Sequence, residues 1–300
     1  MHFQNLCSAW RGDANPSWRF CGGCQALQTL LCSGEMQLVL AQVRKPIREM
    51  RKSLRDLPEN PPQKAVHNLR TRSRRLEAIG TVLPTRDSDK TRHLLKSLRP
   101  LRKAAGEVRD MDVLEAKVQF LLRRTRNQSF AKLLLHLQKV REESAQQLVK
   151  DFSAGKKTVR RGLKRFSKAI DKHLGEMQPD AGQAQKIFNE LSHWPRLGAS
   201  NLHEFRIKLK ELRYMMQLMS NANSALMRAL ENVKMRIGVW HDWEELQRIA
   251  EEILDAGKDR RAIEIIAEIK SKKFGSAMRA AQALRTRYLR THSLLEVVEP

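Results

Sequence analysis

From residue 36 onward, apolar residues recur along the chain with helical spacing. Steps of three and four residues connect the members of three runs: Leu40, Val43, Ile47, Met50, Leu54 and Leu57; Val66, Leu69, Ser73 and Leu76; and Leu202, Phe205, Leu209, Leu212, Met216 and Met219. Residues three and four apart share one face of an α-helix. Each run therefore predicts an amphipathic helix with one buried side.

Prolines, glycines and polar stretches separate the predicted helices. Pro58, Pro61 and Pro62 end the first helix, and Gly80 and Pro84 end the second. Further helices are expected at 88–105, 107–126, 129–153, 156–175, 223–238, 242–256 and 259–289, with breaks at 178–180 and 192–195. Short loops between long amphipathic helices predict antiparallel bundles. An aromatic content of only 5% and abundant straight-chain residues agree with an all-α fold.

The charge balance points to an anionic partner. The 300 residues contain 57 Lys and Arg against 33 Asp and Glu, a net charge of +24, and the pI is about 10.4. A field of this sign recruits polyanions, so nucleic acid, an anionic membrane and inorganic polyphosphate are the candidates. No run of 18 apolar residues is present, so the sequence predicts no transmembrane segment.

The first 35 residues differ from the remainder. They hold all four cysteines, and their charges cancel. Cys21 and Cys24 have the spacing of a zinc or redox pair, but no second pair or matching histidines follow, so we expect neither a metal nor a cofactor. We expect residues 1–35 to be a disordered extension, or the product of a start assigned upstream of Met36. The cysteine-free remainder suits a reducing cytoplasm.

The chain contains an internal repeat. Residues 66–76, VHNLRTRSRRL, align without gaps on residues 202–212, LHEFRIKLKEL. About 40 residues after each copy comes a second matched element, GEVRD at 106–110 and GVWHD at 238–242. Two matched elements in the same order predict two related helical halves, residues 36–180 and 181–300.

Each copy of the first element places basic residues along one side of a helix. The two ladders are His67, Arg70 and Arg74, and His203, Arg206 and Lys210. At 100° per residue the members of each ladder fall within about 60°, and each ladder spans roughly 10 Å along the axis. That length suits a run of several phosphates better than a single phosphate.

Two further basic residues, Arg72 and Lys208, point closer to the apolar side of the same helices. A long side chain in that position pairs with a carboxylate or extends its charge to solvent. Asp110 and Asp242 are the expected partners, which would make Arg72 and Lys208 structural.

These motifs resemble the CHAD domain, the conserved histidine α-helical domain, over about residues 38–290. The resemblance rests on the two histidine-centred segments and on RDMDVL and HDWEEL. It implies two pseudo-symmetric antiparallel helical bundles that form one domain around a basic central groove or pore, which binds inorganic polyphosphate. Family members are often found at polyphosphate granules. The residues that it implies as anion contacts are His67, Arg70, Arg74, Arg75, His203, Arg206, Lys210 and Arg213.

The sequence departs from a strict repeat, and no enzyme motif accompanies it. Arg75 is matched by Glu211, and Arg109 by His241, so the two sides of the groove need not contribute equally. The ExExK motif of the triphosphate tunnel enzymes that precede some CHAD domains is absent, as are a P-loop and a nucleophile–base pair. Because anion binding sufficiently explains a histidine among cations, we expect a non-catalytic binding protein.

A second basic surface is predicted on the helix near residue 160. Its members are Lys157, Arg160, Arg161, Lys164, Arg165 and Lys168, opposite an apolar side formed by Val159, Leu163, Phe166 and Ile170. Four interpretations remain open: an extension of the polyphosphate path, a membrane-surface patch, a nucleic-acid patch, or an outward face that is merely basic.

Nucleic-acid binding is the main alternative function. Aromatic residues are scarce and do not interleave with the ladders, so stacking platforms for single strands are missing. No helix-turn-helix, zinc-finger or RNP signature is present. Sequence-independent binding through phosphates stays open.

Overall fold

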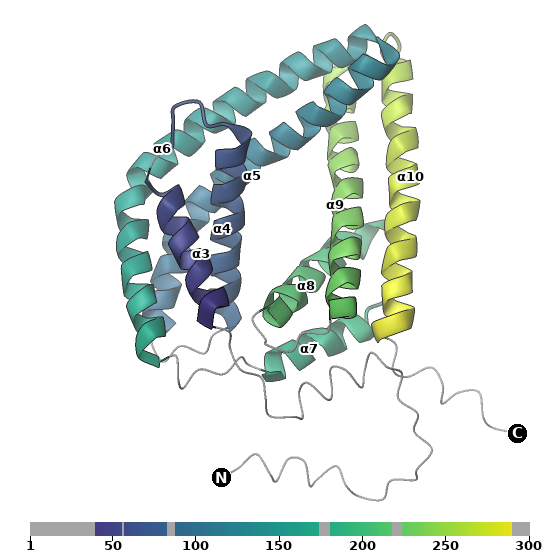
Figure 1. Cartoon of the computed structure of the whole chain (residues 1–300). Helices are drawn as coiled ribbons and strands as arrows, with labels where there is room; N and C mark the ends of the chain where they lie inside the picture. The colour runs from purple at the N-terminus through teal and green to yellow at the C-terminus, as the bar shows by residue number, and fades with distance from the viewer. Residues whose placement is uncertain (1–39, 56, 83–87, 174–180, 218–223, 290–300) are drawn as a thin grey trace, which may run out of the picture.

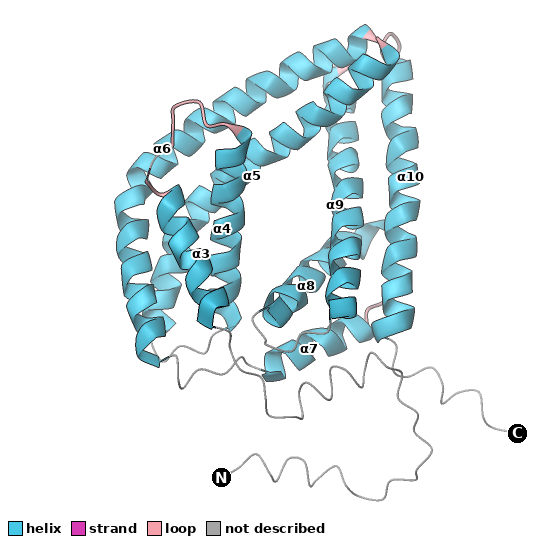
Figure 2. Cartoon of the chain, viewed as in Figure 1, coloured by secondary structure: helices cyan, strands magenta, loops and turns pink. Residues whose placement is uncertain are grey.

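The computed structural model describes residues 40–289 apart from 56, 83–87, 174–180 and 218–223. Within these residues the chain forms eight α-helices and one π-helical turn, with no strand (Figure 2). The elements are α3 (Leu40–Ser53), α4 (Gln63–Val82), α5 (Ser88–Thr125), α6 (Gln128–His173), α7 (Ala181–Ser192), α8 (Ala199–Gln217), α9 (Ser224–Ile253), α10 (Arg260–Leu284) and η2 (Arg285–Leu289). Residues 1–35, with the four cysteines, lie outside the described part, so the expectation for them stays a prediction.

Three predicted helix breaks are wrong. Helix α5 continues through Gly106, α6 continues through Gly155, and α9 continues through residues 239–241. A glycine inside a helix costs only about 1 kcal/mol relative to alanine, which packing can offset. A Cβ at Gly155 would lie 3.8 Å from the Leu101 side chain on α5. The glycine therefore lies where α5 and α6 pack together and does not end the helix.

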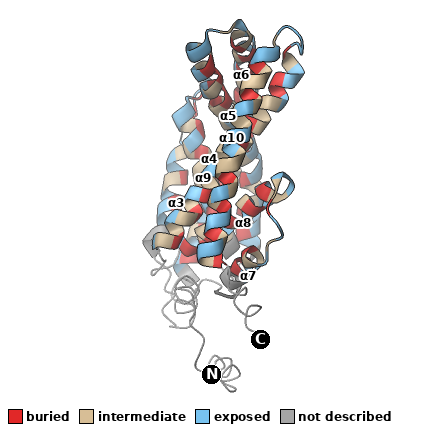
Figure 3. Cartoon of the chain, turned by 90° about the vertical axis from the view of Figure 1, so that its right-hand side faces the viewer, coloured by how far each residue is buried: buried red, intermediate tan, exposed pale blue. Residues whose placement is uncertain are grey.

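The predicted apolar faces form the core. The four residues Val66, Leu69, Ser73 and Leu76 of α4 are each at most 1% exposed. The runs on α3 and α8 are likewise buried, apart from Leu40, whose side chain is not described, and Met219, which lies outside the described residues. Figure 3 shows buried residues along the inner sides of the helices and exposed residues along their outer sides. Helical periodicity therefore identified the buried faces correctly.

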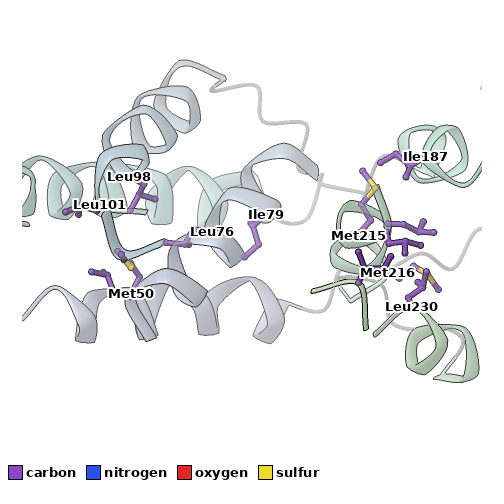
Figure 4. Packing of buried hydrophobic residues seen from close by; sticks show 14 of the residues in the cluster. Met50, Leu76, Ile79, Leu98, Leu101, Ile187, Met215, Met216 and Leu230 are labelled. Atoms are coloured by element: carbon purple, nitrogen blue, oxygen red, sulfur yellow. The ribbon is translucent and has the colours of Figure 1, made fainter. Parts of the chain in front are cut away.

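The helices gather in two groups at the base of the molecule (Figure 1). Helices α3, α4, the first half of α5 and the second half of α6 form one group, and α7, α8 and the adjoining ends of α9 and α10 form the other. In Figure 4, Met50, Leu76 and Leu98 belong to the first group, and Met216 and Leu230 to the second. Contacts between α4 and α8 join the two groups.

A second apolar core joins the two halves at the other end of the molecule. There the α5–α6 hairpin packs against the far ends of α9 and α10 (Figure 1). Its buried members include Leu114, Phe130 and Leu137 from the first half, and Trp243 and Leu246 from the second. The α5–α6 and α9–α10 pairs are thereby fixed at both ends, which holds the faces between them in position.

A buried ion pair fixes the α5–α6 hairpin. Asp112 on α5 is 1% exposed, and its Oδ1 accepts a hydrogen bond from Arg141 Nε at 2.8 Å. The same guanidinium donates to the carbonyl oxygen of Pro61 at 3.0 Å. Removing one partner of a buried ion pair leaves an uncompensated charge, so Asp112 has a structural role.

Candidate functional site

A cavity of about 930 Å³ lies between α4, α5, α8 and α9, with α6 and α7 contributing to its wall. Most of its lining side chains are charged or titratable. Among the described residues these are Arg70, Arg74, Glu77, Arg102, Glu107, Asp110, His203, Arg206, Lys210, Glu211, Tyr214, His241, Asp242 and Glu245.

The repeated ladders supply the cationic part of this lining. On α4 the buried stripe turns Arg70 and Arg74 toward the cavity, and on α8 it turns His203, Arg206 and Lys210 toward the same cavity. Arg70 and Arg206, which are 136 residues apart in the chain, are close enough for each to interact electrostatically with cations of the opposite helix. The structure thus brings five of the eight predicted contact residues together.

The remaining three predicted contacts lie outside the cavity lining. Arg75 pairs with Glu49 of α3 at 3.3 Å, and Arg213 pairs with Glu231 of α9 at 2.6 Å. His67 is close to Arg109 and Arg70, and burial together with these cations lowers the pKa of its imidazole. The residues implied by the resemblance therefore form a cavity set of five and a peripheral set of three.

Arg72 and Lys208 are ion-paired, but the expected partners were wrong. Arg72 reaches Glu49 at 3.9 Å, and Lys208 reaches Glu190 of α7 at 2.7 Å. Both side chains point away from the cavity, toward the helix that packs on the other side. Asp110 and Asp242, the partners predicted from the repeat, lie in the cavity lining instead.

In each half, an arginine of the first matched element packs against the glycine of the second element: Arg70 against Gly106, and Arg206 against Gly238. A Cβ at Gly238 would lie 3.0 Å from Arg206 Nη2, and Arg206 Nε donates to the carbonyl oxygen of Lys234 at 3.2 Å. A Cβ at Gly106 would lie 3.7 Å from Arg70 Nε. The two matched elements, about 40 residues apart in sequence, are therefore in contact in both halves.

The cations repel one another. Burial, followed by the charges of Arg206, Arg74, Arg70 and Lys234, lowers the pKa of Lys210 to about 7. Burial is also the largest cause of the lowered pKa values of the Arg70 and Arg206 guanidinium groups. Desolvation and a like charge both disfavour the charged form of a base. An anion placed among these groups would relieve both effects.

Two histidines lie beside the cationic part of the lining. The His203 ring lies 4.8 Å from the His241 ring, measured between centroids. The His203 pKa is lowered first by burial and then by His241 and Arg206. His241 Nδ1 lies 3.3 Å from Glu244 Oε2. In the first half the position of His241 is taken by Arg109, so the two halves present different groups here.

Carboxylates also line the cavity, which is therefore not uniformly basic. Arg70 Nη2 donates to Asp110 Oδ1 at 3.4 Å, and Arg102 pairs with Glu77 at 2.9 Å. Burial raises the pKa of the Asp110 carboxyl, Arg70 lowers it, and Asp242 raises it. Sequence reasoning had noticed Asp110 and Asp242 in the repeat but had not placed them beside the ladders. It missed Glu77 and Arg102 as a pair on the cavity wall.

The lining shows no arrangement suited to a metal ion. Among the described residues, no group of three or more His, Cys, Asp or Glu side chains could hold one. In the same part of the chain, no helix combines the length and hydropathy that a bilayer span requires.

The second predicted basic surface lies elsewhere. Its six residues on α6, Lys157, Arg160, Arg161, Lys164, Arg165 and Lys168, are all exposed. Val159, Leu163, Phe166 and Ile170 on the opposite side of α6 are completely buried. None of the six lines the cavity. The chain thus presents two separate concentrations of positive charge.

Comparison with protein-family models gives a match to the CHAD domain over residues 40–251. This range covers more than half of the chain and includes both ladders. The chain belongs to the CHAD domain family. A search of curated proteins gave no match.

Two solved structures have a similar fold to this CHAD domain. One is the crystal structure of the CHAD domain from the plant Ricinus communis, with 16% sequence identity, a TM-score of 0.53 and coverage of 93% of this chain and 96% of that chain. The other is PptA from Streptomyces chartreusis, with 16% identity, a TM-score of 0.53 and coverage of 87% and 99%. At this identity the likeness is one of fold, and it confirms the all-α CHAD architecture.

Proposed function

We propose that this CHAD domain protein binds inorganic polyphosphate in the central cavity. The observation that carries the proposal is the cluster of Arg70, Arg74, Arg206 and Lys210, which two repeated helices direct into one cavity. Membership of a family linked in general to polyphosphate binding supports it. We also propose that this binding locates the protein in the cytoplasm at polyphosphate granules.

The chemistry of polyphosphate suits this cluster. The ligand carries about one negative charge per phosphate and has no bases, so a site for it needs ordered cations and little else. Arginine offers paired hydrogen bonds to phosphate oxygens, which lysine does not. The Nε atoms of Arg70 and Arg74 are buried and find no acceptor among the described residues. Entry of an anion would stabilise charges that burial and mutual repulsion now disfavour.

The proposed role is binding without catalysis. The cavity histidines and carboxylates could in principle transfer protons, but each carboxylate near the cluster already faces a cation, as Asp110 faces Arg70 and Glu77 faces Arg102. We therefore propose that the histidines assist anion binding. Release of phosphate from the bound chain on addition of Mg²⁺ would contradict this assignment.

The test is competition binding of labelled long-chain polyphosphate at about 150 mM salt, a concentration at which diffuse attraction is strongly screened. Unlabelled single-stranded DNA, duplex DNA and RNA serve as competitors. We expect excess nucleic acid to leave polyphosphate bound, and R70A/R206A to lower polyphosphate affinity at least about tenfold, since each charged hydrogen bond contributes about 1.5–3 kcal/mol.

R75A/R213A is the matched control. It removes two motif arginines from the same helices, and therefore the same net charge, but both lie outside the cavity lining. We expect this control to lower affinity less than about threefold. Equal losses in the two variants, with equal displacement by every polyanion, would contradict the cavity proposal and leave sequence-independent nucleic-acid binding as the better explanation.

A further inference from the structure

The outer side of the molecule carries a second, unpaired concentration of cations. We name it the α3–α6 face, and it consists of Arg48, Arg51, Lys52 and Arg55 at α3 together with Lys157, Arg160, Arg161, Lys164, Arg165 and Lys168 on α6. All ten residues are exposed. Among the described residues none of the ten side chains forms an ion pair, whereas Arg70 and Arg102 in the cavity lining pair with carboxylates.

Two contacts place these α3 and α6 residues side by side. At one end Arg44 Nη2 lies 2.7 Å from Asp171 Oδ1, and at the other Lys156 Nζ donates to the carbonyl oxygen of Arg55 at 2.7 Å. The two helices therefore run antiparallel over this stretch (Figure 1). Arg48 and Arg51 follow Arg44 at helical spacing, so they lie beside the α6 segment that holds Arg160 and Lys164.

Two described carboxylates near this face are already ion-paired. Asp171 pairs with Arg44, and Glu49 turns toward α4, where it pairs with Arg75. Residues 156–170 contain no acidic residue. The face therefore presents almost only positive charge to an approaching partner.

The dimensions of the face fit a double-stranded partner. Residues 157–168 span roughly 16 Å along α6, and packed helices lie about 8–10 Å apart. The cations thus form two neighbouring rows. A single phosphate chain can follow one row at a time, whereas a duplex presents two phosphate strands across grooves about 6 and 12 Å wide.

The composition of the face argues against the other two partners. A helix that docks on a membrane inserts apolar side chains, but the exposed large hydrophobic residues of the described chain, Phe120, Leu135, Ile207 and Met235, all lie elsewhere. Single-stranded nucleic acid is held by stacking on aromatic side chains, and the face has none.

We propose that the α3–α6 face binds the phosphate backbone of duplex nucleic acid without regard to sequence. The two neighbouring helices offer cations that contact phosphates, and no element of the face enters a groove to contact base edges. Affinity therefore comes from the release of counterions from the phosphates. This site is separate from the cavity, and the proposal does not depend on polyphosphate binding there.

The experiment measures binding of a labelled duplex of about 20 bp at several salt concentrations. The face variant is K157Q/R160Q/R161Q/K164Q/R165Q/K168Q. Its matched control, K96Q/R123Q/K139Q/K258Q/K272Q/K273Q, removes six exposed cations spread over other parts of the chain. Glutamine has a helix propensity close to that of lysine and arginine, so both variants should fold. The smaller set K157Q/R161Q/R165Q provides a second variant.

We expect the face variant to lower duplex affinity at least about tenfold and to reduce the slope of log affinity against log salt by up to about five, since each of the six cations that contacts a phosphate contributes about 0.9 to the slope. The control should lose less than about threefold. R70A/R206A should bind duplex as the unmodified protein does, and the face variant should keep its polyphosphate affinity.

Three results would overturn the proposal. Equal loss in the face variant and the control would show that total charge, and not this surface, attracts duplex. Loss of polyphosphate binding in the face variant with duplex binding intact would assign the face to polyphosphate. If the face variant lost binding to phosphatidylserine vesicles but kept its duplex affinity, the face would be assigned to a membrane. In each case the cavity variant still reports separately on the proposed polyphosphate site.

Discussion

The cavity and the α3–α6 face both concentrate positive charge, but they do so in opposite ways. In the cavity, cations from α4 and α8 are partly buried, repel one another and lie among carboxylates such as Asp110 and Glu77. On the face, cations are exposed and have no ion-pair partner among the described residues. The cavity thus offers a small number of partly buried contacts, and the face offers many exposed, hydrated ones.

This difference suits the cavity to specific binding and the face to general electrostatic attraction. Exposed charges act through a field that salt screens over about 8 Å at physiological ionic strength. Charges held in a partly buried site interact more strongly and depend on geometry. A substitution in the cavity should therefore change affinity by a large factor per residue, whereas the face should respond to the number of charges removed.

Neutralising the cavity carboxylates should have the largest effect. We expect D110N/D242N to raise polyphosphate affinity at least about tenfold, because the negative charges of Asp110 beside Arg70 and of Asp242 near Arg206 are removed in a partly desolvated site. The matched change on the face is D171N, which frees Arg44 and should raise duplex affinity less than about threefold. Titrations of each ligand at fixed salt measure both effects. A fall in polyphosphate affinity in D110N/D242N would mean that the carboxylates hold the arginines in position.

The pH dependence should come next in size, and Lys210 should cause most of it. With a free-state pKa of about 7, Lys210 loses its proton as the pH rises above 7, whereas a bound polyanion favours the protonated form. Binding therefore takes up protons, and the contribution of Lys210 to polyphosphate affinity should be steady below about pH 7 and fall severalfold toward about pH 9. Duplex binding at the exposed face should not depend on Lys210.

The variant K210R tests this assignment, because arginine remains protonated over the whole range. Its affinity should vary little between about pH 7 and 9, and calorimetry in buffers of different ionisation enthalpy should show less proton uptake. If K210R had the same pH profile as the unmodified protein, the pH dependence would be assigned to other cavity groups, such as His203.

The smallest effect on polyphosphate affinity should come from substituting Gly106 and Gly238, against which Arg70 and Arg206 pack. In G238A the new Cβ would lie 3.0 Å from Arg206 Nη2 and displace it, whereas in G106A the nearest arginine atom lies 3.7 Å away, an ordinary contact. We expect a three- to fivefold loss of polyphosphate affinity in G238A and less than about twofold in G106A, since one charged contact is weakened. Both should keep or raise their melting temperature, because alanine favours the helix by about 1 kcal/mol. Equal affinities would show that Arg206 adapts freely.

The local pattern of the sequence predicted most helical segments and their buried faces, although it divided α5, α6 and α9. Val66, Leu69, Ser73 and Leu76 are buried as their spacing predicted, because a regular helix fixes which residues share a side. The same regularity places Arg70 beside that stripe in one half and Arg206 in the other. The repeat also contains Gly106 and Gly238, but only the structure shows that the side chains of Arg70 and Arg206 pack against these two glycines.

Only the tertiary structure decided which charged groups meet. Arg75 and Arg213 lie on the same helices as Arg70 and Arg206, yet each pairs with a glutamate on a neighbouring helix. Helix periodicity fixes the direction of a side chain about its own axis but carries no information on which helix packs there. The sequence by itself therefore determined the all-α class, the two ladders and the basic outer strip. Packing determined that five ladder residues share one cavity with carboxylates and that α3 and α6 combine into one face.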